Sequence, residues 1–281
     1  MTACGHCGAD VSHRPYAAVR GKNALPSVSA ISGMLDDGKS DTMPWASSLI
    51  AASTAVHSPQ LWAHLDAADC TGDKDGLCAA CRFLRYQFKV VWDAKRDFGS
   101  HIHHLALSWA NGDDVEVDSV SEPYMDALER FYADCEPEWI EKERTVLYDK
   151  PWSHGYRGQF DGIAWLNRNG ERERFLCDVK TGRYYPTEQT LQLAGYRYAQ
   201  HLTTWENGTE HIDGPVPSVA YAAVVLLGDD GRYRLVELPA NGDAHGAFLR
   251  LRDGWGFAKQ MKRWAKEHPL PAIEEMEEVR V

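Results

Sequence analysis

Residues 157–180 read RGQFDGIAWLNRNGERERFLCDVK, and this stretch decides the fold. Residues 157–166 and 171–180 are both rich in aromatic and aliphatic positions, as β-strands are. The dipeptide Asn169-Gly170 between them is the strongest short sequence signal for a β-hairpin. We therefore expect two antiparallel strands joined by a two-residue turn.

Such a turn pairs position 168 with position 171 and, counting outward, Asp161 with Asp178. Opposed like charges destabilise a sheet unless a cation lies between them, and a divalent ion meets that need. Because side chains alternate along a strand, Lys180 lies on the same face as Asp178. The pattern predicts two carboxylates and an ammonium on one patch, suited to Mg²⁺ or Mn²⁺ and to orienting a water for attack on a phosphate.

The constellation resembles the PD-(D/E)XK nuclease superfamily, specifically the RecB-like branch that includes CRISPR-associated and phage exonucleases. Its motifs cover roughly residues 99–200 and the rest of the core is similar by pattern only. The motifs follow one another as Gly99-Ser-His-Ile-His103, Gly158-Gln-Phe-Asp161, Asp178-Val-Lys180 and Gln192-x-x-x-Tyr196. The proline of the superfamily's name is absent, since Phe160 precedes Asp161.

The resemblance implies a restriction-endonuclease-like core and a role for each motif residue. The implied catalytic residues are Asp161, Asp178 and Lys180, and the implied metal ligands are His103, Asp161, Asp178 and Val179. Gln192 and Tyr196, which share one helix face, are implied to contact DNA. Glu143 is similar to a glutamate that precedes the aspartate strand in the family and contacts the metal ligands rather than the ion. The lysine is expected to position or activate the attacking water.

Simpler interpretations of the same residues stay open. His101 and His104 flank His103, so the choice among the three histidines depends on the family spacing. Gln192 and Tyr196 also suit the polar edge and the core aromatic of an amphipathic helix. Glu143 lies in the run Glu141-Lys-Glu-Arg144, which could be a solvated charged segment.

The composition indicates a globular protein. Of the 281 residues 44% are hydrophobic and ten are tryptophan, and no apolar run is long enough to span a bilayer. The start of the chain lacks the pattern of a secretion signal, so we expect a cytoplasmic protein with reduced thiols and no membrane contact. The net charge of −11 argues against a broad electrostatic grip on nucleic acid. Basic residues flank the motifs and line a late helix, which favours local binding of DNA in a narrow channel.

The order of predicted elements gives a mixed α/β (α+β) fold, a central mixed sheet flanked by helices. Expected helices cover 79–111, 119–135, the segment after Pro186 and 243–267, and a further helical region begins at Ser27. Expected strands cover 143–149, the hairpin, and a second hairpin at 217–228 and 231–238. The predicted organisation is a helical, cysteine-bearing extension over 1–98, a nuclease core over 99–268 and an acidic tail over 269–281.

Two Cys-x-x-Cys pairs form a second candidate site, Cys4 with Cys7 and Cys78 with Cys81. This spacing lets neighbouring thiolates bind one tetrahedral ion, and a structural Zn²⁺ is the natural candidate. The alternatives are an iron–sulfur cluster, a single metal-binding pair, or unrelated free thiols. The iron–sulfur arrangement of some relatives places cysteines after the nuclease motifs, and here the last cysteine is Cys177.

The leading functional hypothesis is a metal-dependent DNA exonuclease in recombination, repair or phage DNA metabolism. An endonuclease acting on branched or single-stranded DNA is the alternative enzyme. A non-catalytic nucleic-acid-binding accessory module on the same fold is the alternative of another class. Expected partners are DNA and a helicase or recombination protein, since the chain has no nucleotide-binding Gly-rich loop of its own.

Overall fold

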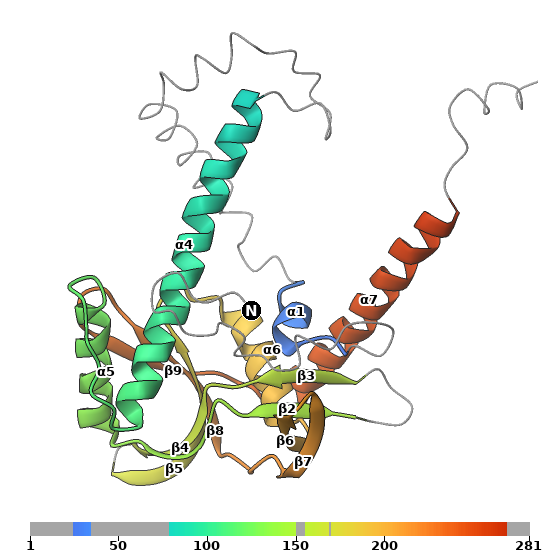
Figure 1. Ribbon diagram of the computed structural model, residues 1–281. Helices are drawn as coiled ribbons and strands as arrows, with labels where there is room; N and C mark the ends of the chain where they lie inside the picture. The colour runs from blue at the N-terminus through green and yellow to red at the C-terminus, as the bar shows by residue number, and fades with distance from the viewer. Residues whose placement is uncertain (1–24, 35–78, 150–154, 169, 269–281) are drawn as a thin grey trace, which may run out of the picture.

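The structure is a computed structural model that describes residues 25–34, 79–149, 155–168 and 170–268, with side chains described for all of these except 79–92. Its mixture of helices and strands confirms the predicted α/β class. In Figure 1 the two long helices, α4 and α7, project from a body that holds the strands. None of the helices in these ranges combines the length and apolar character that crossing a membrane requires.

The described helices are α1 (Val28–Ser32), α4 (Ala79–Ala110), α5 (Glu122–Cys135), α6 (Pro186–Arg197) and α7 (Gly242–Glu267). The strands are β1 (Glu138–Lys142), β2 (Thr145–Tyr148), β3 (Tyr156–Gln159), β4 (Gly162–Arg168), β5 (Glu171–Lys180), β6 (His201–Glu206), β7 (Thr209–Pro215), β8 (Tyr221–Leu227) and β9 (Tyr233–Glu237). The helices predicted over 79–111, 119–135, after Pro186 and over 243–267 are all present, with their ends within a few residues of the predicted ones. The helical region predicted from Ser27 begins with α1, and residues 35–78 lie outside the described part of the chain.

Within the described residues the strands form two sheets. A five-stranded sheet has the order β1-β4-β5-β8-β9, and a four-stranded sheet has the order β3-β2-β6-β7. In the larger sheet β5 and β8 are parallel and the other pairs are antiparallel, so this sheet is mixed as predicted. The chain passes from β5 through α6 and the β6–β7 hairpin before it returns as β8.

The hairpin register is confirmed. Arg168 pairs with Glu171 and Gly162 pairs with Cys177, as a two-residue turn requires, and Gly170 in the turn has a φ of +84°. Asn169 lies outside the described residues.

The prediction of one strand over 157–166 is wrong, because β3 ends at Gln159, β4 begins at Gly162, and the two belong to different sheets. The bend has a packing cause. The side chain of Phe160 is buried in the core, and the Trp139 ring covers Gly162 so closely that a Cβ there would lie 2.2 Å from the ring.

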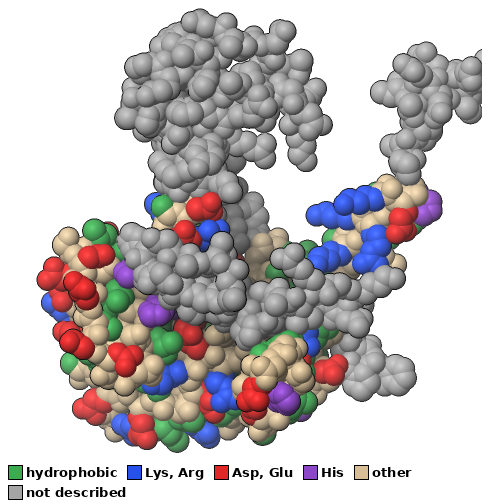
Figure 2. Space-filling view, in the orientation of Figure 1, with side chains coloured by type: hydrophobic (Ala, Val, Ile, Leu, Met, Phe, Trp, Pro, Cys, Tyr) green, Lys and Arg blue, Asp and Glu red, His purple; other side chains and the backbone are tan. Residues whose placement is uncertain are grey.

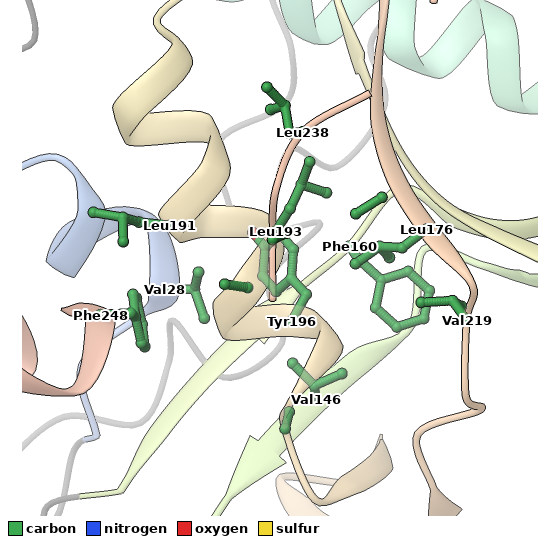
Figure 3. Close-up of a cluster of buried hydrophobic side chains, with 14 of the residues drawn as sticks. Val28, Val146, Phe160, Leu176, Leu191, Leu193, Tyr196, Val219, Leu238 and Phe248 are labelled. Atoms are coloured by element: carbon green, nitrogen blue, oxygen red, sulfur yellow. The ribbon is translucent and has the colours of Figure 1, made fainter. Parts of the chain in front are cut away.

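Apolar side chains pack on both faces of the larger sheet. One cluster joins the sheet to α1, α6 and α7, and Figure 3 shows its members, among them Val28, Tyr196 and Phe248. The other joins the sheet to α4 and α5 through residues such as Ile102 and Phe131. Along β5 the side chains alternate between these clusters, so the sheet is buried on both faces at its centre.

The structure also bears on the predicted boundary between extension and core. Val28 and Ile31 of α1 are fully buried in the core cluster, and the Ser27 side chain caps this helix by accepting a hydrogen bond from the Ala30 amide. Helix α4 runs unbroken through position 98. Residues 25–34 therefore pack against the part of the chain predicted as the core, and the predicted division at residue 98 falls inside a helix; the domain organisation stays a prediction.

Candidate active site

In the chain, Asp161 lies between β3 and β4, which belong to different sheets. Hydrogen bonds fix both its backbone and its side chain. Its carbonyl oxygen accepts a 2.9 Å hydrogen bond from the Glu143 amide. Its carboxylate oxygen Oδ2 accepts a 2.6 Å hydrogen bond from the amide of Val179 on β5. The predicted cross-strand pair with Asp178 is not formed as a ladder pair, because Asp161 lies one residue before β4. The Asp161 carboxylate instead binds the edge of β5 directly.

His103 is the histidine that reaches this carboxylate. It projects from α4, and its Nδ1 lies 3.6 Å from Asp161 Oδ2. Among the described residues, His103, Asp161, Glu143 and Val179 line a small cavity of about 40 Å³ together with apolar side chains of α4 and α5. Neither His101 nor His104 is part of that lining. The geometry thus brings together the histidine and the first aspartate that the family spacing selected.

Asp178 and Lys180 form an ion pair along β5. Lys180 Nζ lies 2.7 Å from Asp178 Oδ2, and the two side chains are 28% and 3% exposed. Burial raises the pKa of the Asp178 carboxyl above its usual range; the Lys180 charge opposes that rise, and the Asp161 carboxylate adds to it. Asp178 is therefore a buried acid whose charged form depends on a nearby cation.

The four predicted metal ligands are near one another, but they do not surround a common position at which an ion could bind. Within the described parts of the chain, no three His, Cys, Asp or Glu side chains lie close enough to hold an ion. The donor types nevertheless suit a divalent cation, because carboxylate oxygens are the ligands that Mg²⁺ and Mn²⁺ prefer and imidazole also binds divalent metals. The Val179 amide points to Asp161, and since a strand residue directs its N–H and C=O to the same neighbouring strand, its carbonyl oxygen is expected on that edge as well.

The predicted DNA-contacting pair on α6 has a different environment from the one expected. Tyr196 is only 3% exposed and its ring lies in the core cluster of Figure 3, so it cannot stack on a base in this structure. The Gln192 side chain donates a 3.1 Å hydrogen bond to the Tyr196 hydroxyl. Tyr196 fits the simpler interpretation of a core aromatic, and a DNA contact stays a prediction for the half-buried Gln192 alone.

The charged run before β2 is structural rather than merely solvated. Arg144 donates to Glu141 at 2.9 Å and also pairs with Asp213 of β7. Glu143 adopts a left-handed conformation with φ of +46°, and its carbonyl accepts a hydrogen bond from Gln159. The predicted supporting role of Glu143 thus has a physical basis, since its backbone holds both Gln159 and Asp161.

Lys142 is a residue that the sequence analysis did not single out. It lines the same cavity as His103 and Asp161, and its ammonium contacts the Asn111 side chain and, at 3.4 Å, the Ala110 carbonyl at the end of α4. Its position in a run of charged residues does not distinguish it from its neighbours. Prediction of a strand at β1 paired with β4 would have identified it, because that pairing sets Lys142 opposite Gly162, next to Asp161.

A polar groove begins where the Asp178–Lys180 strand ends. It has a volume of about 620 Å³ and is lined by Thr181 and Gly182, by the turn between β8 and β9, and by Tyr124. Arg232 and Arg234 contribute cations to its wall, and Asp229 and Asp230 contribute carboxylates. The groove therefore follows directly after Lys180 in the chain and offers charged groups to a ligand.

The predicted cysteine site is largely outside the described residues. This applies to Cys4, Cys7 and Cys78, and the side chain of Cys81 in α4 is likewise not described. A structural zinc on these four residues stays a prediction that elemental analysis would check. Cys135 and Cys177 are buried thiols in the core, as expected.

No protein-family model matches this chain, and no curated protein matches it. Among solved structures, the crystal structure of SSO0001 is similar, with 17% sequence identity and a TM-score of 0.29. The match covers 55% of this chain and 65% of that chain, so the chain spans about two thirds of that protein's length.

Proposed function

We propose that the protein is a metal-dependent deoxyribonuclease that hydrolyses phosphodiester bonds and acts as an exonuclease. The observation that carries the proposal is the junction at Val179. There the Asp161 carboxylate accepts the Val179 amide hydrogen and lies 3.6 Å from His103, while Asp178 and Lys180 pair on the same strand. The order of these residues along the chain is that of the RecB-like nuclease branch.

Burial and charge assign a different role to each residue of the candidate site. His103, Asp161, Asp178 and the Val179 carbonyl would hold Mg²⁺ or Mn²⁺, which when bound supplies Lewis-acid stabilisation of the phosphate charge. Lys180 is the more exposed member of its ion pair and can reach toward solvent, where it would orient the attacking water. Asp178 fixes the direction of that ammonium through their ion pair. In the reaction the water loses a proton as its oxygen bonds to phosphorus, the phosphorus–oxygen bond to the leaving nucleotide breaks, and the leaving oxygen takes up a proton.

The groove after Lys180 supports a polymeric substrate. Its volume of about 620 Å³ exceeds what the reacting phosphate alone needs, and Arg232 and Arg234 in its wall can contact phosphates, although Asp229 and Asp230 line it as well. The short distance in sequence from Lys180 to Thr181 and Gly182 puts the groove beside the reacting groups. This arrangement suits a strand that passes the site rather than a small phosphate ester.

The test is cleavage of labelled linear and covalently closed circular DNA by the purified protein, with EDTA, Mg²⁺ or Mn²⁺. We expect metal-dependent release of nucleotides from linear DNA and no attack on the circle. Asp178→Asn should abolish the activity, and Asp114→Asn, an exposed carboxylate outside the cavity, is the matched control. Cutting of the circle would replace the exonuclease by an endonuclease. Binding of DNA without cleavage under any of these metals would favour the accessory module.

A further inference from the structure

The outer part of α7 carries a strongly basic face that the candidate active site does not use. Every residue from 257 to 268 is exposed, so these turns leave the body of the protein without burying a face. Figure 1 shows α7 projecting beyond the sheets, and Figure 2 shows Lys and Arg side chains gathered on this part. A helix of this length is marginal by itself, because most helical stability in proteins comes from packing.

The basic side chains of this segment lie on one face. Residues 257–268 contain four basic residues, Lys259, Lys262, Arg263 and Lys266, and one carboxylate, Glu267, although the whole chain has a net charge of −11. At 3.6 residues per turn, spacings of three, four and seven bring these four side chains within about a third of the helix circumference. The apolar residues Phe257, Met261 and Trp264 lie on the roughly opposite side.

The helix dipole does not explain the basic face. Cations stabilise a helix only within about its last turn, and Lys266 is the basic residue found there. Lys259 lies about two turns earlier, and its ammonium is 3.8 Å from the centre of the Trp255 ring. Within the described residues, none of the four cations forms an ion pair with a carboxylate. The charges are thus available to an external anion.

We infer that this face, formed by Lys259, Lys262, Arg263 and Lys266, binds the phosphate backbone of DNA outside the catalytic centre. The face from Lys259 to Lys266 is about 10 Å long at 1.5 Å per residue, which matches about three phosphates at 3.4 Å of helix axis per strand. The inference rests on the proposed function for the identity of its ligand. It explains how a chain with a net charge of −11 can hold a negatively charged polymer, because these four cations are concentrated on one projecting helix.

The experiment measures binding of fluorescent single-stranded and duplex DNA in EDTA, where cleavage does not interfere. The test variant combines Lys262→Ala and Lys266→Ala, and the charge-matched control combines Lys95→Ala and Arg130→Ala on other helices. Alanine favours helix, and circular dichroism checks that α7 is retained. The dependence of log affinity on log salt should become shallower by about 1.4 for single strands and about 1.8 for duplex in the test variant, and should not change in the control.

A second variant separates DNA from other ligands of a basic amphipathic helix. Phe257→Ala combined with Trp264→Ala removes the apolar side and should leave DNA affinity unchanged. Anionic phosphatidylserine vesicles are the competing probe, because basic amphipathic helices also bind lipid surfaces through their apolar side. Vesicle binding that this variant loses, together with a DNA salt dependence that the lysine variant does not alter, would overturn the inference.

The outcomes for α7 and for the active site are separable. A protein that cleaves DNA but whose binding is indifferent to Lys262 and Lys266 would refute the role of α7 and leave the nuclease proposal standing. Conversely, the shallower salt dependence in a protein that cleaves no DNA would support the α7 contact and refute the catalytic proposal.

Discussion

The Asp161 carboxylate accepts a 2.6 Å hydrogen bond from the Val179 amide, so this side chain bonds to the edge of β5 just beyond Gly162, the first residue of β4. This bond ties the first carboxylate of the candidate site to the strand that carries the second carboxylate and the lysine. Their relative positions therefore depend on the hairpin register, which the turn at Gly170 sets. The same bond gives Asp161 two separable roles, one in holding β5 and one in binding a cation.

Asp161→Asn and Asp161→Ala should separate those roles. Asparagine keeps an oxygen that can accept the Val179 hydrogen but removes the negative charge, whereas alanine removes both. We expect both variants to lose at least about a hundredfold in cleavage rate. Only Asp161→Ala should also lose stability, by about 1–3 kcal/mol, because the Val179 amide loses its partner. Urea unfolding in EDTA measures the stability, and equal stabilities of the two variants would contradict the structural role.

His103→Ala should weaken binding of Mg²⁺ or Mn²⁺ by more than about tenfold, because the ion would lose the imidazole nitrogen that we propose as one of its ligands. Isothermal titration calorimetry with the ion alone measures this directly. His101→Ala and His104→Ala are matched controls from the same turn of α4, and neither residue lines the cavity with Asp161. Equal ion affinity in His103→Ala and the wild type would mean that the histidine is not a ligand.

Gly158→Ala should destabilise the fold rather than act on the chemistry. A Cβ at this position would lie 2.5 Å from the Tyr196 ring and 2.8 Å from Val28, in the core between β3, α6 and α1. Overpacking of this kind costs about 1–3 kcal/mol of unfolding free energy. Gly182→Ala is the control, since a Cβ there meets no atom within 4 Å. Unchanged urea midpoints in both variants would show that β3 can move away from α6 at little cost.

The hairpin and the long helices could be predicted from the sequence because their signals are local. The Asn-Gly dipeptide fixed the β4–β5 register, and amphipathic periodicity marked α5 through Leu128 and Phe131, both of which are buried. A second dipeptide of the same kind, Asn207-Gly208, joins β6 to β7 with both residues at positive φ. This dipeptide indicates a hairpin, but the polar and charged residues of β7 lack the alternating apolar pattern by which a strand is predicted.

The second sheet could not be predicted, because it depends on contacts distant in the chain. β2 pairs with both β3 and β6, and Phe160 and Asp161 separate β3 from β4. Beside this break, Trp139 packs closely on Gly162. The burial of Tyr196 has the same origin, since its ring fills space beside Gly158 and Phe160. Spacing along α6 correctly placed Gln192 and Tyr196 on one face, but it could not tell that this face is turned to the core.

Asp178→Asn should abolish cleavage and yet leave the metal-free protein as stable as the wild type, or more stable by about 1 kcal/mol near neutral pH. The reason is that burial opposes the charge of Asp178, and replacing a buried charge by a neutral group of the same shape removes that opposition. Lys180, at 28% exposure, can stay solvated when its partner is neutral.

The pH dependence of that difference has a defined sign. Because the pKa of Asp178 is raised in the native protein, the native state binds the proton more tightly than the unfolded chain does. Stability of the metal-free wild type should therefore fall as the pH rises from about 3.9, the value for an unfolded Asp, through the raised native value, while Asp178→Asn lacks this contribution. Urea unfolding in EDTA across this range should show the two proteins converging at acid pH.

Adding Mg²⁺ at neutral pH should then stabilise the wild type and not the variant, because only the wild type gains a cation at this carboxylate. A variant that is less stable than the wild type by more than about 2 kcal/mol in EDTA would show instead that the Asp178–Lys180 pair is a net stabilising contact of the fold.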